Sequence, residues 1–287
     1  MVKPSQNNLS VAFFGTPDRA VYVLDELKKA GILPNLIITQ PDRPQGRKLI
    51  LTPPPVKTWA QKEGIEVLQP STLKDEHFIN TLKSGHFDVF VVVAYGKILS
   101  QEILDIPKHG ALNLHASLLP LLRGSCPIET AILTDMKETG VSIIRMDDKM
   151  DHGPIIAEKK IIPPTWPLPA DQLAKLLVTE GGKLFADILP QWVAGTLKAT
   201  EQDHSKATFT KKIVKEDGEI NLSDNGYTNF LKYNAYKGWP NTFFFADIKG
   251  KRTRITITDA EYKDGMFIIK KVIPEGKKEM PWNEHYA

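Results

Sequence analysis

The chain has 287 residues, of which 41% are hydrophobic and 25% charged, and its formal net charge is +3. This is an ordinary globular composition, and the length allows two domains of unequal size. The single cysteine, Cys126, excludes an internal disulfide and a four-cysteine zinc site. No run approaches the ~20 apolar residues that span a bilayer, and the N-terminus is more typical of a first strand than of a signal peptide. We therefore expect a cytoplasmic protein.

Residues 1–160 alternate short β-rich runs with helical patterns. Strands are predicted at LSVAFFG, NLIITQ, IEVLQ, FDVFVVVAYG and ALNLHA, and helices near 17–30, 56–63, 74–84 and 127–133. This alternation predicts right-handed crossovers and a mostly parallel, Rossmann-like α/β sheet. Two later runs, GVSIIRM and GPIIAEKKI, are expected to pair as a hairpin and to add an antiparallel end to that sheet.

The second half of the chain changes character. A long amphipathic helix is predicted over 171–197, and the following segment is polar, basic and nearly without periodicity, as in a linker or a wrapping segment. A helix near 225–236 and three β-rich runs follow. The sequence therefore predicts an α/β domain at 1–194, a basic linker at 195–210 and a small β-barrel-like domain at 211–287.

Two segments early in the chain are candidate ligand sites. FFGTP joins a strand to a helix but lacks the three-glycine dinucleotide fingerprint, so a plain structural turn is favoured. The proline-rich segment Thr39–Lys57 carries Arg43, Arg47, Lys48 and Lys57. A basic loop beside the carboxyl edge of a sheet is suited to phosphates, and a solvated surface loop is an equally good interpretation.

The stretch ALNLHASLLPLLRGSCPIETA places Asn113 and His115 two residues apart on a predicted strand. Alternation directs both side chains to the same side, where the strand reaches the carboxyl edge of the sheet. The alternative is a structural histidine. In MDDKMDHGPI, a carboxylate brought beside His115 would orient the ring and stabilise its cationic form. A metal site of His115, Asp151 and His152 is disfavoured because no dense ligand motif accompanies them.

Taken together, FFGTPD, TQPDRPQGR, VVVAYGKIL, NLHASLLPLLRGSCPI, ETGVSIIRMDDKMDHGPII and PEGKKEM resemble the methionyl-tRNA formyltransferase family. The pieces occur in the family's order over most of the chain. The resemblance implies a formyltransferase fold with an OB-like C-terminal domain. It also implies transfer of a formyl group from the co-substrate 10-formyltetrahydrofolate to the α-amino group of initiator methionyl-tRNA, with no metal. A monomer is expected.

The resemblance also assigns residues. The catalytic asparagine, histidine and aspartate of the family fall on Asn113, His115 and Asp151. Its folate-contacting segment falls on Ser117, Leu118, Leu119 and Pro120, and its tRNA-contacting basic loop falls around Arg43, Arg47 and Lys48. We add Lys206, Lys211 and Lys212, which extend the basic track, with a solvated linker as the alternative for each lysine.

Three departures from the family pattern keep other substrates open. Leu121 and Leu122 replace a basic residue and an aromatic, Leu49 and Ile50 stand where lysines are usual, and the C-terminal domain lacks roughly a hairpin of strand length. One alternative is formylation of another amine, such as an amino sugar nucleotide. A second is an RNA-binding protein without activity, against which the three intact site residues argue.

Overall fold

The computed structural model describes residues 9–46, 48–248 and 250–282. The chain forms two compact units, each built from several segments. The larger unit comprises the residues up to 123 together with 140–161 and 175–208, and the smaller unit comprises 124–139, 162–174 and the residues from 209 onward. The predicted division of the chain into continuous domains, with boundaries at residues 194 and 210, stays a prediction.

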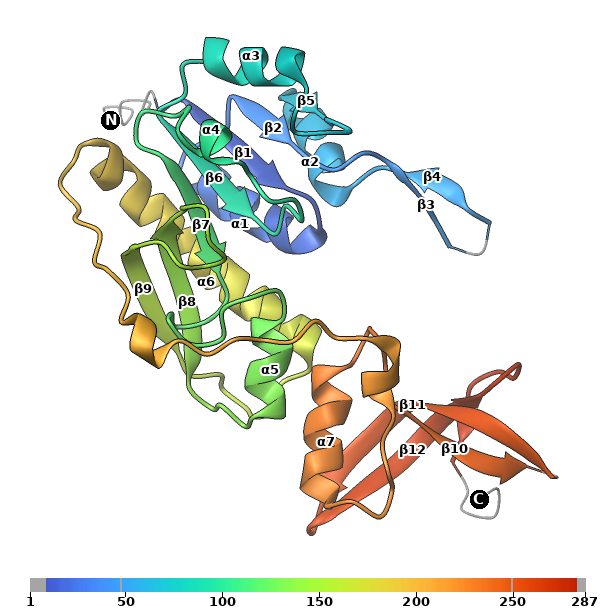
Figure 1. The fold of residues 1–287 in the computed structure, drawn as a ribbon. Helices are drawn as coiled ribbons and strands as arrows, with labels where there is room; N and C mark the ends of the chain where they lie inside the picture. The colour runs from blue at the N-terminus through green and yellow to red at the C-terminus, as the bar shows by residue number, and fades with distance from the viewer. Residues whose placement is uncertain (1–8, 47, 249, 283–287) are drawn as a thin grey trace, which may run out of the picture. The chain divides into compact units, whose positions relative to one another are not determined.

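A seven-stranded sheet forms the centre of the larger unit (Figure 1). Its strands, in spatial order, are β5 (Glu66–Leu68), β2 (Leu36–Ile38), β1 (Val11–Gly15), β6 (Val89–Val93), β7 (Ala111–His115), β8 (Thr139–Arg145) and β9 (Ile155–Ile161). The pairs from β5 to β7 are parallel, and β7 pairs antiparallel with β8. The mostly parallel sheet with an antiparallel end is thus confirmed. Strand order reverses between β1 and β6, and ligands of open α/β sheets bind at such a switch point.

Helices lie along both faces of this sheet (Figure 1). They are α1 (Asp18–Lys29), α2 (Pro55–Glu63), α3 (Glu76–Ser84), α4 (Gln101–Leu104) and α6 (Ala170–Val193). All but α4 were predicted. Local chemistry sets two of the helix ends: the Asp75 carboxylate accepts a hydrogen bond from the Phe78 N–H at 2.9 Å, and Gly64 ends α2 in the left-handed region at φ 70°.

The core of the larger unit is packed closely around β1, β6 and β7. Every residue of β1 and β6 is buried, as expected for strands covered on both faces. Helix α6 approaches β7 through Gly181, where an added Cβ would lie 2.6 Å from the Leu114 side chain. A glycine is therefore required for this helix to reach the strand that carries Asn113 and His115.

The segment predicted as a basic loop contains a short hairpin. Strands β3 (Arg43–Gln45) and β4 (Ile50–Thr52) pair antiparallel. Leu49, Ile50 and Leu51 are 72%, 61% and 64% exposed, so three large apolar side chains lie in solvent near the hairpin end. Neither strand buries a face, and this explains why hydrophobic periodicity did not reveal them.

The smaller unit contains α5 (Pro127–Leu133), α7 (Gly226–Ala235) and an antiparallel sheet. The sheet order is β10 (Phe243–Ile248), β11 (Lys251–Lys263), β12 (Met266–Pro274) and β13 (Met280–Pro281), which confirms a small β domain. Asp135 ties its segments together, because one carboxylate oxygen accepts from Trp166 Nε1 at 2.7 Å and from the Tyr227 hydroxyl at 2.8 Å. Within the described ranges, no helix has the length and apolarity to cross a membrane.

Tyr95 gives a test of the core. It is 2% exposed, its ring packs edge-on against Phe14, and its hydroxyl has no hydrogen-bond partner among the described residues. Burial raises the pKa of Tyr95 to about 12, from about 10 in an unfolded chain. Below pH 10 the hydroxyl is protonated in both states. Between pH 10 and 12 only the unfolded state ionises, so stability falls as the pH rises through that window.

We therefore expect Tyr95→Phe to leave the free energy of unfolding at pH 7 unchanged or to raise it by up to about 1 kcal/mol, because no hydrogen bond is lost. Between pH 10 and 12, the free energy of unfolding of the variant should also fall by about 2 to 3 kcal/mol less than that of the parent. Urea unfolding at pH 7, 10 and 11.5 measures both effects. Destabilisation by more than about 1 kcal/mol at pH 7 would show that the hydroxyl has a partner.

Candidate functional site

Two polar side chains interrupt the apolar strand β7 at its carboxyl end. Asn113 is half-buried and His115 is 5% exposed. They lie two residues apart, so both project to the same side of the sheet. In the part of the chain that the structure describes, no residue hydrogen-bonds the Asn113 amide. A half-buried amide of this kind has donor capacity left for a ligand.

The His115 ring is fixed by a backbone carbonyl seven residues ahead. His115 Nε2 lies 2.9 Å from the Leu122 oxygen, and because a carbonyl only accepts, Nε2–H is the donor. The other ring nitrogen, Nδ1, lies 3.6 Å from Asp151 Oδ2. The ring therefore presents Nδ1 to a carboxylate that attracts positive charge on it.

Asp151 reaches this position from the connection between β8 and β9. It adopts φ 49°, in the left-handed region that few residues other than glycine favour. Gly153 lies so close to the Arg145 carbonyl that an added Cβ would overlap it. The connection is closed by a hydrogen bond from the Arg145 N–H to the Pro154 oxygen at 3.0 Å. The loop is thus held tightly to the end of β8, with its carboxylate at His115.

The predicted folate-contacting segment forms a pinned turn directly after β7. The Ser117 hydroxyl donates to the Leu121 carbonyl at 2.6 Å, and the Leu119 N–H donates to Ser142 Oγ at 2.9 Å. Ser117 is 1% exposed, so its hydroxyl holds the turn. The Leu119–Pro120 peptide bond is cis. Leu118 and Pro120 are half-buried and offer a partly apolar surface.

Leu121 and Leu122 serve this site through their backbones. Their carbonyl oxygens accept from Ser117 and His115, respectively. Leu122 has φ 60° and a buried side chain. At the two positions that depart from the family pattern, the contacts to the site are therefore made by the backbone and not by the side chains.

Two buried polar residues beside the site were not predicted. Arg123 and Gln202 are 4% and 5% exposed, and the guanidinium donates to Gln202 Oε1 through Nη2 at 2.6 Å and through Nε at 3.2 Å. Gln202 lies in the segment predicted as a linker, which pairs with β9 through Ile155 and Thr200. Their sequence separation of 79 residues explains why no local pattern indicated the contact.

Three of the predicted tRNA-contacting residues are described in the larger unit, two at the hairpin and one on the polar segment after α6. Arg43 is exposed in β3, with Nη2 3.5 Å from Gln40 Oε1, and Lys48 is exposed near the hairpin end. Arg47 lies outside the described residues. Lys206 is 74% exposed but pairs with Asp203 at 2.9 Å. A hydrogen bond from Ser205 first, and the contact with Lys206 next, lower the pKa of Asp203 to about 2.

Lys57 anchors the base of the hairpin. Its ammonium contacts both Asp42 oxygens at 2.9 Å, and Gln69 donates to Asp42 at 2.7 Å. The Gln69 hydrogen bond first, and Lys57 next, hold the pKa of Asp42 below its usual value. Since its charge is engaged by Asp42, Lys57 has less left to offer a phosphate than Arg43 or Lys48.

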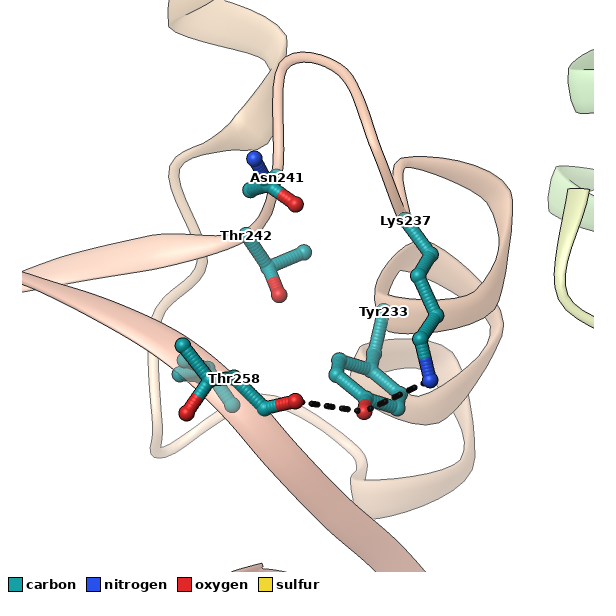
Figure 2. Close-up of a pocket in the computed structure, with 6 residues that line it drawn as sticks. Tyr233, Lys237, Asn241, Thr242 and Thr258 are labelled. Atoms are coloured by element: carbon teal, nitrogen blue, oxygen red, sulfur yellow. Dashed lines mark hydrogen bonds between the residues drawn. The ribbon is translucent and has the colours of Figure 1, made fainter. Parts of the chain in front are cut away.

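Lys211 and Lys212 lie in the smaller unit, and both are exposed. This unit also holds a small cavity of about 130 Å³ (Figure 2). Tyr233 and Lys237 face Thr242 and Thr258 across it, and the Tyr233 hydroxyl donates to the Thr258 carbonyl at 3.3 Å. Ligand pockets usually measure roughly 300 to 1,000 Å³, so this cavity is too small for a folate.

In the described ranges, no three His, Cys, Asp or Glu side chains gather in a way that would hold a metal ion. His152, which belongs to the disfavoured metal alternative, is engaged elsewhere. Its Nδ1–H donates to Asp147 at 2.6 Å, and its ring stacks on His204 with centroids 4.1 Å apart.

Known proteins match this chain over most of its length. The family model described as formyl transferase matches residues 8–167. A methionyl-tRNA formyltransferase of Chloroflexus aggregans is 43% identical over 269 residues, covering 91% of this chain and 85% of that protein. One from Thermus thermophilus is 36% identical, with 97% of both chains covered.

Solved structures agree in fold. A methionyl-tRNA formyltransferase from Clostridium thermocellum aligns with a TM-score of 0.61 at 16% identity, covering 93% of this chain and 98% of that one. A sugar 3N-formyl transferase, solved in the presence of dTDP and 5-N-formyl-THF, gives a TM-score of 0.61 at 17% identity, covering 94% and 99%. By its sequence, the chain belongs to the formyl transferase family, and the two relatives described above, 43% and 36% identical, are named methionyl-tRNA formyltransferase.

Proposed function

We propose that this protein transfers a formyl group from 10-formyltetrahydrofolate to the α-amino group of initiator methionyl-tRNA. The products are N-formylmethionyl-tRNA and tetrahydrofolate, for use in translation initiation. The observation that carries the proposal is the placement of Asn113 and His115 on one side of β7 with Asp151 3.6 Å from the ring. The names of the relatives support the choice of substrate.

The reaction needs hydrogen-bond donors at one oxygen. The amine attacks the formyl carbon, a new C–N bond forms, and the carbonyl oxygen takes the displaced electron pair. The Asn113 amide is one donor. The second is His115, which has to donate through Nδ1 in this step because Nε2–H is already bonded to the Leu122 carbonyl. One donor of this kind typically contributes about 2.7 to 4 kcal/mol to lowering the barrier.

Proton transfer completes the reaction. An α-amino group has a pKa of about 7.7 to 8.0, so near pH 7 a fraction is already the neutral nucleophile. The attacking nitrogen must still lose a proton as the bond forms, and Asp151, directly or through a water, accepts it. The electron pair on the oxygen then re-forms the carbonyl, the bond between the formyl carbon and the folate nitrogen breaks, and the proton taken by Asp151 passes to that nitrogen.

The two substrates are proposed to contact different segments of the chain. The turn Ser117–Pro120 next to His115 is proposed as the folate contact, since its pinned backbone offers a fixed surface beside the reacting atoms. Arg43, Arg47 and Lys48 are proposed to contact the tRNA backbone, with Lys206, Lys211 and Lys212 extending the basic track. Phosphate contacts of this kind make affinity fall with salt.

A second candidate is formylation of an amino sugar nucleotide. The smaller unit, with its four strands, leaves less surface for RNA than a longer domain, and sugar N-formyltransferases share this fold. The same Asn113, His115 and Asp151 would serve that amine equally well.

His115→Ala and Asn113→Ala should each lower kcat/KM by at least about 100-fold, because each removes one donor at the developing oxyanion. The melting temperature should stay within a few degrees of the parent. His77→Ala and Asn80→Ala, both exposed on α3, are matched controls and should keep full activity. A near-normal rate in either site variant would remove that residue from the oxyanion assignment.

The direct test of the function offers 10-formyltetrahydrofolate with one amine at a time: charged initiator tRNA, charged elongator methionine tRNA and an amino sugar nucleotide. Initiator methionyl-tRNA should be formylated fastest, measured as formyl transfer per second. Faster formylation of the sugar amine would favour the second candidate. Absence of turnover with every amine, in folded protein that binds RNA, would instead indicate an inactive RNA-binding protein.

Replacing Arg43, Arg47 and Lys48 together by Ala should raise KM for charged tRNA and leave kcat within about twofold. The slope of log affinity against log salt should flatten by up to about 2 to 3, at about 0.7 to 0.9 for each lost phosphate contact. Lys62, Lys74 and Lys83, also exposed, form the matched triple-Ala control. An unchanged KM in the hairpin variant would make the hairpin an ordinary solvated surface.

A further inference from the structure

We propose that Arg123 and Gln202 are positioning residues that hold Asp151 opposite His115. The inference rests on the proposed function, because it needs Asp151 to act in formyl transfer. Gln202 lies beyond residue 167, where the match to the formyl transferase model ends. Its contribution comes from the segment that follows α6 along the chain.

Gln202 uses its whole side-chain amide on the Asp151 loop and on Arg123. Nε2 donates to the Asp151 carbonyl at 2.9 Å and to the Gly153 carbonyl at 2.7 Å, and Oε1 accepts from the guanidinium. Only a primary amide offers two donors and an acceptor in this geometry. With 5% exposure, water cannot easily replace these bonds, so the loop depends on this residue for its path.

Arg123 connects this contact to the histidine. Its side chain fixes Gln202, while the preceding carbonyl, that of Leu122, accepts from His115 Nε2–H. The contacts thus form a closed ring: His115 to Leu122, Arg123 to Gln202, Gln202 to Asp151, and Asp151 back to His115. A shift at any member changes the separation of the carboxylate from the imidazole.

The segment 200–208 contacts this circle of residues at Asp151 through Gln202 and at Leu122 and Arg123 through Thr208. Thr208 accepts from the Arg123 N–H through its carbonyl at 2.9 Å and from the Leu122 N–H through its hydroxyl at 2.8 Å. Leu122 and Asp151 both have positive φ, at 60° and 49°. A positive φ costs free energy in a residue other than glycine and persists only where neighbouring contacts hold the backbone in place. Here the hydrogen bonds from Gln202 and Thr208 are those contacts.

The test begins with Gln202→Met, which keeps the length of the side chain and removes all four of its hydrogen bonds. We expect kcat to fall about 10- to 100-fold, because a displacement near 1 Å in a catalytic group costs up to about 100-fold. KM for 10-formyltetrahydrofolate should stay within about twofold. Gln191→Met is the matched control, since the Gln191 side chain makes a single, exposed hydrogen bond, to the Asp187 carbonyl, and kcat of this variant should not change.

A second variant separates positioning from folding. Gln202→Glu keeps an acceptor for Arg123 but turns a carboxylate oxygen toward the two carbonyls of the loop. A loss of kcat comparable to that of Gln202→Met, with a melting temperature near the parent, supports the proposal. Near-normal kcat in this folded variant would overturn it, whether or not Gln202→Met folds.

The decisive measurement is a double-mutant cycle on single-turnover rates. If Gln202 acts through Asp151, adding Gln202→Met or Gln202→Glu to Asp151→Asn should change the rate by less than about twofold. A loss in the double variant that multiplies the two single losses would overturn positioning. An undiminished rate in Asp151→Asn alone would contradict the proposed function. A slow Asp151→Asn beside a normal Gln202→Glu would contradict this inference only.

Discussion

The hydrogen bond from His115 Nε2–H to the Leu122 carbonyl is the contact on which the rest of the site depends. It commits one ring nitrogen to the protein, so that the other faces Asp151. It also requires the chain to turn back within seven residues, which places the turn at Ser117–Pro120 beside the ring. The local path after β7 thus sets both the chemistry of the imidazole and the surface next to it.

Much of the fold followed from periodicity, and the exceptions have physical causes. The strands and long helices of the larger unit bury apolar faces, so their spacing showed in the sequence. Helix α4 has four residues, too few for a period, and the β3–β4 hairpin buries no face. Neither element was predicted, because hydrophobic periodicity appears only in elements that are long enough to repeat and that bury one face against a core.

The candidate site also contains residues that could be predicted from the sequence and residues that could not. Strand alternation alone placed Asn113 and His115 on one side of the sheet, while Asp151 came from the family resemblance. Neither strand alternation nor the family resemblance identified Arg123 and Gln202. Their contact joins positions 79 residues apart, and the polar composition around Gln202 is typical of solvated chain. Burial of that glutamine is a property of the folded larger unit, so a one-dimensional pattern carries no sign of it.

The bonds of the segment 200–208 bear on where the larger unit ends as a folding unit. Thr200 pairs with β9, and Thr208 holds the backbone at Leu122 and Arg123. A fragment cut after α6 would keep every strand of the sheet and all three proposed catalytic residues. It would nevertheless leave the loops around them without their brace. During synthesis, the contacts of Thr208 with the loop next to the proposed catalytic residues can therefore form only after residue 208 has left the ribosome.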